Sequence, residues 1–248
     1  MSVRALVVDP TVPAAVRLAA VCDPTPGPGQ VLVAVSHASL NYGDLNDARS
    51  GRVPEGAVLG SDSAGVAALR SLRAAGLGPD KTVLVTGASG GVGRFAVQLA
   101  ARAGAHVIAS VGSAARGKGL AEAGADDVLI GLEGLRRPVD VVIDSVGGPQ
   151  LVAAWNLLSP GGGVQSVGWT SGEAAVFPPY ATVGPAKSLT SFVIEGDVGA
   201  DLAVLTELAA EGALTVEIGW QGSWDRFDEA SRALRERRVS GKAILTVA

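Results

Sequence analysis

The sequence feature that most constrains the fold is a glycine-rich turn between a strand and a helix, at residues 82–93. The stretch reads Thr-Val-Leu-Val-Thr-Gly-Ala-Ser-Gly-Gly-Val-Gly, and a helical pattern begins directly at Arg94. Glycine in such a turn lets the backbone approach a pyrophosphate closely, and the N–H groups that open the helix face the anion. The alternative is a tight turn of an α/β core without a ligand. The pattern favours a dinucleotide site made by Ser89, Gly90, Gly91, Val92 and Gly93.

The segment after the next strand indicates which dinucleotide fits. The strand at His106–Ser110 ends about twenty residues after the turn, where NAD-binding units usually carry Asp or Glu. This chain has Ser110 there, followed by Ser113 and Arg116. A carboxylate would repel a ribose 2′-phosphate, whereas Ser113 and Arg116 could bind one. The pattern therefore favours NADP over NAD. The alternative is that Arg116 and Lys118 are solvated charges at the start of a surface helix.

Composition and charge narrow the class of partner to small molecules. The 248 residues suffice for one large or two small domains. The net charge of −4, with no cluster of Lys and Arg, argues against nucleic acid and anionic membranes. A single cysteine, Cys22, cannot form an internal disulfide, which suits a reducing compartment. No basic-then-apolar leader and no apolar run of ~18 residues are found, so we expect a cytoplasmic protein without a membrane span.

Hydrophobic patterning divides the chain into three parts. Residues 1–66 are strand-like, at Arg4–Asp9, Val16–Cys22 and Gln30–Ala38. Residues 67–210 alternate strands and helices, which predicts an α/β fold with a doubly wound parallel sheet and ligands at the carboxyl ends of its strands. The expected elements of this part are helices at Ala67–Ala75, from Arg94 and at 114–123, and strands at Thr82–Thr86, His106–Ser110, Asp127–Ile130, Val139–Asp144, Gly163–Gly168 and Leu189–Ile194. Residues 211–248 close with a helix, Asp225–Arg238, and a strand, Lys242–Val247.

Six different short motifs, spread over almost the whole chain, carry a resemblance to a known family through their order and spacing. They are Asn41–Asp44 with Arg49–Gly51, Gly60–Gly65, Thr86–Gly93, Val139–Gly148, Ser159–Gly162 and Gly241–Leu245. Through them the chain resembles a zinc-free medium-chain dehydrogenase/reductase of the quinone oxidoreductase type. The resemblance implies a Rossmann domain at 67–210 and a GroES-like β-barrel catalytic domain, made from 1–66 and the returning segment 211–248. It also implies hydride transfer from NADPH to a quinone or a conjugated carbonyl substrate.

The resemblance assigns roles to residues outside the turn. Asn41 and Tyr42 would approach the reacting face from the catalytic domain, together with Asp44, and the Tyr42 hydroxyl could bond a carbonyl oxygen or donate a proton through water. The alternative is that Asn41 and Asp44 cap loop backbone and Tyr42 is a packing ring. On the cofactor side, the expected contacts are Asp144 near the end of its strand and, along the nicotinamide, Val167, Gly168, Phe192 and Val193.

Zinc ligands are missing at the positions where zinc-using relatives carry them. Those relatives have Cys-His in place of Asn41-Tyr42 and His-Glu in place of Ser61-Asp62, so only Asp62 could ligate a metal. The two histidines, His37 and His106, have no partner at a ligand spacing. We therefore expect no metal site.

One segment of the family pattern is absent from this chain. After Val66 the pattern would continue through roughly 70 residues of barrel, about half of a typical domain, and Ala64–Val66 is the expected seam. Three functions stay open: an NADPH-dependent reductase, a nucleotide-binding protein with weak turnover, and a biosynthetic enzyme that uses the pocket for a non-redox step. The resemblance also implies a homodimer joined at a sheet edge within Ala174–Ile194.

Overall fold

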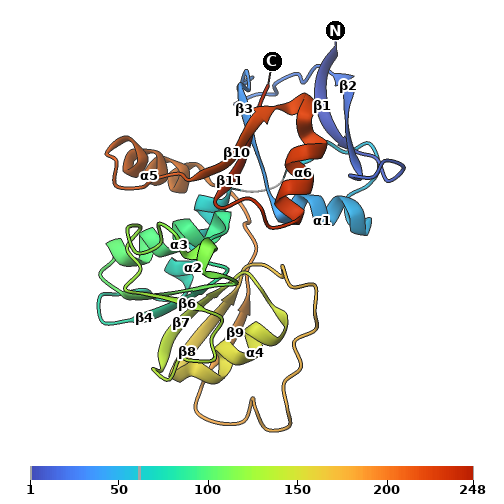
Figure 1. Cartoon of the computed structure of the whole chain (residues 1–248). Coiled ribbons are helices and arrows are strands. Elements are labelled where there is room, and N and C mark those ends of the chain that lie inside the picture. Colours follow the sequence, from blue (N-terminus) through green and yellow to red (C-terminus); the bar gives the residue numbers. More distant parts are fainter. Residues whose placement is uncertain (1, 61–62, 248) are drawn as a thin grey trace. The chain divides into compact units, whose positions relative to one another are not determined.

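The computed structural model describes residues 2–60 and 63–247 and divides the chain into two compact units (Figure 1). Unit 1 combines Met1–Ser61 with Ile218–Ala248, and unit 2 is Asp62–Glu217. Unit 2 is thus one continuous stretch inserted into the sequence of unit 1. The assignment of unit 1 to a GroES-like catalytic domain stays a prediction.

Unit 2 is built on a six-stranded parallel sheet in the order β6-β5-β4-β7-β8-β9. The strands are β4 (Thr82–Thr86), β5 (His106–Val111), β6 (Asp127–Ile130), β7 (Val139–Asp144), β8 (Leu158–Ser166) and β9 (Ser188–Ser191). The strand order reverses between β4 and β7, which is where open α/β sheets bind their ligands. The predicted α/β class with a Rossmann-like sheet is confirmed.

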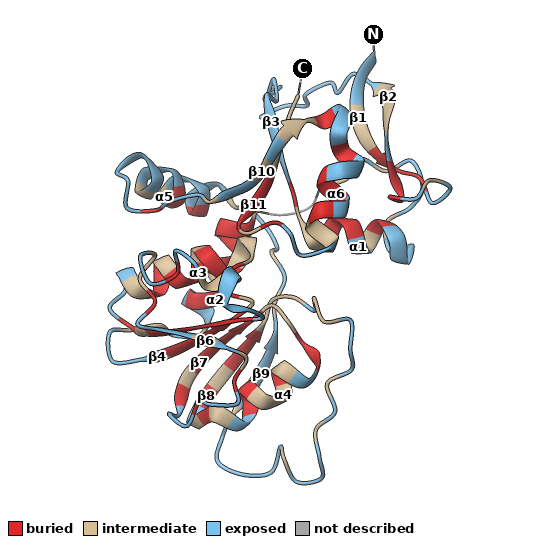
Figure 2. Cartoon of the chain, in the orientation of Figure 1, coloured by how far each residue is buried: buried red, intermediate tan, exposed pale blue. Residues whose placement is uncertain are grey.

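Helices cover both faces of this sheet, so its central strands are apolar on both sides (Figure 2). One core contains Val83, Val85 and Val141 and packs against α2 (Ala64–Ala74), α3 (Gly91–Arg102) and α5 (Gly199–Ala210). The other contains Leu84 and Val142 and packs against α4 (Gly148–Leu157). Alternate residues of one strand therefore enter different cores, which fixes the register of the sheet.

Several predicted elements of unit 2 differ from the structure. The strand expected at Gly163–Gly168 is β8 (Leu158–Ser166), the strand expected at Leu189–Ile194 ends at Ser191, and α5 was not predicted. The helix expected at 114–123 is only a 3₁₀ turn, Ala114–Gly117. Gly119 and Gly124 follow with φ of 72° and 106°, a conformation that a helix does not accommodate. Helix α2 begins at Ala64, three residues before the expected start, so the expected seam at Ala64–Val66 forms its first turn.

Unit 1 contains a hairpin and a three-stranded sheet. The hairpin pairs β1 (Ser2–Val8) with β2 (Val16–Cys22). The sheet has the order β10-β11-β3, from β10 (Ile218–Ser223), β11 (Lys242–Thr246) and β3 (His37–Leu40). Helices α1 (Tyr42–Ser50) and α6 (Phe227–Arg235) complete a core that includes Leu45, Phe227 and Leu245.

The strand expected at Gln30–Ala38 is wrong over most of its length. Residues 30–36 form no strand, although the carbonyl oxygen of Ser36, next to β3, accepts a hydrogen bond from the N–H of Val247 (2.9 Å). The side chains of Val31 and Val33 are 82% and 67% exposed. An alternating apolar pattern fits a strand, but a strand also needs a neighbour that takes up its hydrogen bonds. No strand among the described residues pairs with this segment, which we call the unpaired segment, 30–36.

Candidate functional site

The glycine-rich turn connects the carboxyl end of β4 to the first turn of α3. Gly90 is the N-cap of the helix and Gly91–Gly93 form its first turn. The N–H of Gly90 donates to the carbonyl oxygen of Gly87 (2.9 Å), and Gly87 itself has φ of 64°. A Cβ at Gly93 would collide with that carbonyl and lie 2.7 Å from the Cα of Ala88. The turn therefore packs backbone against backbone, and only glycine fits at position 93.

This arrangement leaves the amino terminus of α3 available to an anion. The first N–H groups of a helix have no intrahelical acceptor, and they carry the positive end of the helix dipole. In α3 those groups belong to the glycine-rich segment itself, where side chains do not shield them. The turn can thus donate several backbone hydrogen bonds to a phosphate.

The loop after β5 reaches this turn. The Nε of Arg116 donates to the Oγ of Ser89 at 2.9 Å, and Ser89 is buried. Ser113 is exposed and precedes the 3₁₀ turn that carries Arg116. Ser110 lies elsewhere: its buried hydroxyl donates to the carbonyl of Gly131 and accepts from Gln150. The structure therefore brings Ser89 and Arg116 together, whereas Ser110 holds the loop that follows β6.

Asp144 ends β7 as a fully buried carboxylate. It accepts hydrogen bonds from the hydroxyl of Thr86 and from the N–H of Gly147 (2.8 Å). Burial raises the pKa of the Asp144 carboxyl, and the hydrogen bonds from Thr86 and Gly147 oppose that rise. Through these two hydrogen bonds Asp144 links the loop after β7 to Thr86, the last residue of β4 before the glycine-rich turn.

The loops after β8 and β9 complete the row of predicted cofactor residues. The N–H groups of Val167 and Gly168 donate to the carbonyl oxygen of Asp144 at 2.8 and 3.2 Å. Phe192 donates its N–H to Ser166 (3.1 Å) and is half-buried, whereas Val193 is exposed. In a parallel sheet these loops all lie at the same edge (Figure 1).

A buried hydroxyl at this edge of the sheet, that of Ser145, lacks a hydrogen-bond partner in the part of the chain that the structure describes, and a cofactor could supply one. The Oγ of Ser145 is buried and has no hydrogen-bond partner among the described residues. It belongs to the loop that meets the turn, because a Cβ on Gly87 would lie 3.6 Å from the Cβ of Ser145. Buried polar atoms rarely stay unpaired. This hydroxyl, the glycine turn and the start of α3 fit the phosphates and hydroxyls of a nicotinamide nucleotide.

In unit 1, a polar network surrounds the predicted catalytic Asn41. Asn41 is the N-cap of α1; its Nδ2 donates to the Oδ2 of Asp44 (3.2 Å) and its Oδ1 accepts from the Nζ of Lys242 (2.6 Å). Asp44 and Lys242 are both buried. Because an ammonium only donates and a carboxylate accepts, these two partners fix which way the amide points.

Lys242 is a functional candidate that sequence reasoning missed. It stands in the Gly241–Leu245 stretch that supported the resemblance, yet no pattern marked it as a site residue. Antiparallel pairing of β3 with β11 places Leu40 opposite Ala243, and this brings the lysine beside Asn41. Only the long-range pairing could have identified the contact.

Tyr42 is half-buried at the first position of α1. The guanidinium of Arg237 lies 4.4 Å from the centre of its ring, a cation–π contact within unit 1. This contact holds the ring, and it places a positive charge beside the predicted proton donor.

The described residues contain no group of three or more His, Cys, Asp or Glu side chains that could hold a metal. Ser61 and Asp62, at the position of the relatives' His-Glu pair, lie outside those residues. His106 lies 2.9 Å from Asp127, and His37 pairs with Ser36 at 3.0 Å. No helix in the described part of the chain is long and apolar enough to cross a membrane.

Comparison with known proteins agrees with this architecture. Residues 120–245 match the sequence profile of the family described as zinc-binding dehydrogenase. Acryloyl-coenzyme A reductase of Metallosphaera sedula is 30% identical over 189 residues, which are 71% of this chain and 54% of that protein. The chain spans about half the length of the curated relatives it matches.

Solved structures share the fold at lower sequence identity. The quinone oxidoreductase from Coxiella burnetii aligns with a TM-score of 0.84 at 20% identity, covering 100% of both chains. A mycobacterial protein complexed with NADPH aligns with a TM-score of 0.84 at 21% identity, covering 99% of this chain and 100% of that one. The family profile spans half of the chain and the fold agrees with it, so the chain belongs to the zinc-binding dehydrogenase family of the medium-chain dehydrogenase/reductase superfamily.

Proposed function

We propose that this protein is an NADPH-dependent, zinc-independent oxidoreductase that transfers a hydride to a quinone or a conjugated carbonyl substrate. The observation that carries the proposal is the row of groups at the carboxyl edge of the sheet of unit 2. There the glycine turn, the Arg116–Ser89 pair and the unpartnered Ser145 hydroxyl offer an anion site, a cation and polar contacts. Relatives named as an acryloyl-coenzyme A reductase and a quinone oxidoreductase support the substrate class.

In this proposal the residues of unit 2 bind and orient the cofactor, which supplies the hydride when it is bound. Gly91, Val92 and Gly93 donate backbone hydrogen bonds to the pyrophosphate, Gly90 shapes the turn through its bond to Gly87, and Ser113 and Arg116 bind the 2′-phosphate. The loop residues Val167, Gly168, Phe192 and Val193 flank the nicotinamide. Asp144 does not touch the reacting atoms, but its bonds to Thr86 and Gly147 hold the two loops that do the binding.

The residues of unit 1 would act on the substrate carbonyl. Asn41, fixed between Asp44 and Lys242, presents an oriented amide, and the Tyr42 hydroxyl donates a hydrogen bond or relays a proton to the substrate oxygen. The cation–π contact with Arg237 holds the Tyr42 ring in place. No Lewis acid is required when the acceptor is an alkene conjugated to a carbonyl.

Two further properties belong to the proposal. The chain works as a homodimer joined through β9, the outermost strand of the sheet. Its location is the cytoplasm, in keeping with the free, exposed thiol of Cys22.

A second candidate is a nucleotide-binding protein with weak turnover. The observation that favours it is the unpaired segment 30–36, whose valines are exposed instead of forming a wall of unit 1. Turnover with a substrate panel separates the two candidates.

The test measures nucleotide affinity and turnover in the purified chain. NADPH should bind at least tenfold tighter than NADH, because an arginine–phosphate bond contributes roughly 1.5–3 kcal/mol and ~1.4 kcal/mol is tenfold. Arg116→Ala should remove that preference, and Lys118→Ala, at an exposed cation two residues away, should keep it. NADPH oxidation with enones and quinones should persist in a strong chelator. Equal affinity for both nucleotides in the parent protein would disprove the NADP assignment, and absence of turnover would favour the second candidate.

A further inference from the structure

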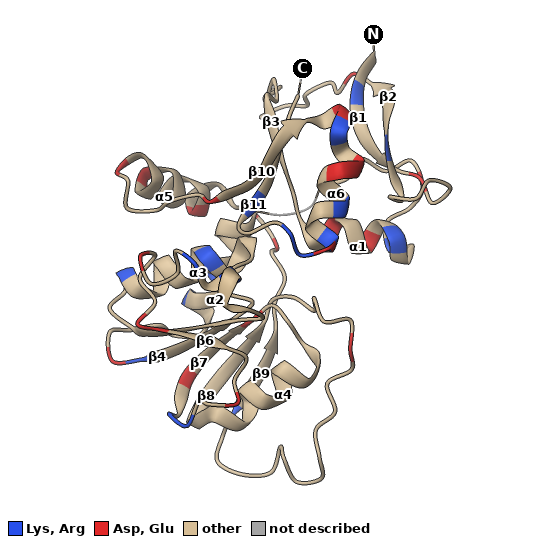
Figure 3. Ribbon diagram, viewed as in Figure 1, with Lys and Arg blue, Asp and Glu red and all other residues tan. Residues whose placement is uncertain are grey.

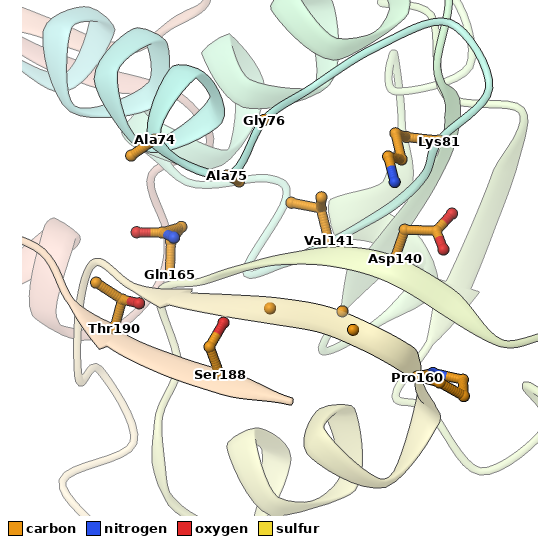
Figure 4. A pocket seen from close by; sticks show the side chains of 13 residues that line it. Ala74, Ala75, Gly76, Lys81, Asp140, Val141, Pro160, Gln165, Ser188 and Thr190 are labelled. Atoms are coloured by element: carbon orange, nitrogen blue, oxygen red, sulfur yellow. The ribbon is translucent and has the colours of Figure 1, made fainter. Parts of the chain in front are cut away.

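A hollow of about 220 Å³ lies in unit 2, and none of its lining residues is one assigned to the nucleotide (Figure 4). Lys81, which directly precedes β4, and Asp140, near the start of β7, line one end of it. The glycine-rich turn follows the opposite end of β4. The Lys81–Asp140 end of the hollow therefore lies at the other edge of the sheet from the glycine-rich turn, whereas Gln165 and Thr190 precede Val167 and Phe192 by two residues.

The register of the sheet explains why the hollow is polar. Val141 pairs with Gly163, and Gly163 with Ser188; one row further, Ile143 pairs with Gln165, and Gln165 with Thr190. All six residues face the side of the sheet that α2 covers, because Val141 and Ile143 belong to that core. The face thus changes from aliphatic at β7 to glycine, amide and hydroxyl at β8 and β9. A buried parallel sheet would carry apolar residues throughout.

The polar side chains of the hollow are not paired with one another. Gln165 is 5% exposed, its Oε1 is buried, and neither atom of its amide has a hydrogen bond within the described residues. The side chains of Lys81, Ser188 and Thr190 likewise have no hydrogen bond or ion pair in that part of the chain. Figure 4 shows Gln165 and Thr190 at one end of the hollow, Lys81 and Asp140 at the other, and Ser188 between them.

We propose that this hollow binds a small, uncharged, polyhydroxylated molecule of the sugar or polyol class. A buried amide has one group that donates hydrogen bonds and one that accepts them. A ligand hydroxyl can both accept and donate, so it can pair with either group, whichever way the amide is turned. One cation and one anion line the hollow, so its charge does not favour an ionic ligand. An apolar ligand would leave Gln165 unpaired, which disfavours it. A water molecule takes about 30 Å³ of liquid volume, so the hollow has room for a monosaccharide.

Glycine supplies the room for this ligand. A Cβ at Gly163 would lie 2.7 Å from the hydroxyl oxygen of Ser188. A larger residue at this position would push into the floor of the hollow. The glycine therefore leaves the Ser188 hydroxyl free to line the hollow beside Gln165.

The test uses the whole chain, with D-xylose as the probe and tetrahydropyran, which is the ring of xylopyranose without hydroxyls, as the matched control. D-xylose should cause saturable NMR shifts of the Gln165 side-chain amide and of the backbone amides of Gly163, Ser188 and Thr190; tetrahydropyran should not. Gln165→Met removes the amide at similar volume and should weaken D-xylose binding at least tenfold, with an unchanged or higher melting temperature. Ser188→Ala serves as a second variant. Gln221→Met, at an exposed residue of unit 1, should leave binding unchanged.

Two outcomes would overturn the proposal. They are the absence of saturable shifts with D-xylose and equal shifts with tetrahydropyran. Both titrations are made at constant protein concentration, so that pairing of β9 between copies does not change during them. NADPH titrated into the same samples reports the nucleotide site independently. The failure of one proposal can therefore be told from the failure of the other.

Discussion

Single residues decide whether the nucleotide turn can form, and Gly93 is the clearest case. Gly93→Ala places a methyl group against the Gly87 carbonyl and the Ala88 backbone, neither of which can move without distorting β4. We expect a loss of about 1–3 kcal/mol of stability, typical of overpacking, and loss of NADPH binding. Gly112→Ala is the matched control, because a Cβ there would meet nothing within 4 Å. Thermal unfolding and NADPH titration measure both; unchanged binding in Gly93→Ala would contradict the role of the turn.

The buried carboxyl of Asp144 gives the stability a pH dependence of known sign. Its pKa is raised in the folded protein, so as the pH rises from near 3.9 the unfolded chain loses its proton first and unfolding becomes easier. That contribution to stability is present at lower pH and is lost as the pH rises through the folded pKa. Asp144→Asn removes this ionisation. The unfolding free energy of the parent minus that of the variant should therefore fall with rising pH and then level off. Denaturant melts across this range test it; a constant difference would refute it.

For single residues, the sequence predicted local geometry better than long-range contacts. The glycine-rich turn lies between β4 and α3, as its local pattern predicts, and Arg116 bonds to Ser89, while the roles of these residues toward a nucleotide stay predictions. The bond between Lys242 and Asn41 was not predictable, since it joins residues 201 positions apart. Ser145 was missed for a related reason, because an unpaired buried hydroxyl is visible only in three dimensions.

Among the elements, β9 is the edge strand of the six-stranded sheet without a charged residue; the other edge strand, β6, begins with Asp127. Strand β9 is the last strand of the sheet, all four of its residues are exposed, and none is charged (Figure 3). Such an edge favours pairing with another copy. Phe192 donates its N–H to β8, so the N–H of Ser191, one residue earlier, points away from β8.

This geometry gives a direct test of the proposed dimer. Ser191→Pro removes an outward donor while leaving the pairing with β8 in place, and should convert a dimer into a monomer at micromolar concentration. Ser191→Ala keeps the donor and should remain dimeric. Light scattering gives the mass of each. A monomeric parent protein would rule out the dimer, and a dimeric Ser191→Pro would move the interface away from β9.

Element prediction succeeded where a segment's own pattern determines its state. The buried parallel strands are short aliphatic runs, and β4 and β7 occur at the expected residues. Helix α1 was missed because Tyr-Gly-Asp-Leu-Asn-Asp-Ala-Arg-Ser has little apolar periodicity and several weak helix formers. The unpaired segment 30–36 has a strand's pattern, but pairing depends on a partner strand that no local pattern can guarantee.

For the whole molecule, each unit has a core made from its own residues. Both cores of unit 2 lie within 62–217, and the core of unit 1 contains none of those residues. We expect a fragment of residues 62–217 to unfold cooperatively and to bind NADPH within about threefold of the whole chain, which is less than 1 kcal/mol. It should not reduce an enone or quinone, because Asn41 and Tyr42 are absent from it. Turnover by the fragment would exclude the proposed roles of those two residues.

The insertion of unit 2 into unit 1 also sets the order in which the chain can fold as it is made. The ribosome synthesises β3 before unit 2, whereas its partner β11 follows unit 2 in the chain. Throughout the synthesis of unit 2, β3 has no strand to pair with. Unit 2 can therefore fold before β11, which unit 1 needs for its sheet, has been synthesised. A nascent chain that stalls before β11 would therefore carry a folded unit 2 together with an unpaired β3 and the exposed valines of the unpaired segment 30–36, the kind of surface that chaperones bind and proteases cut.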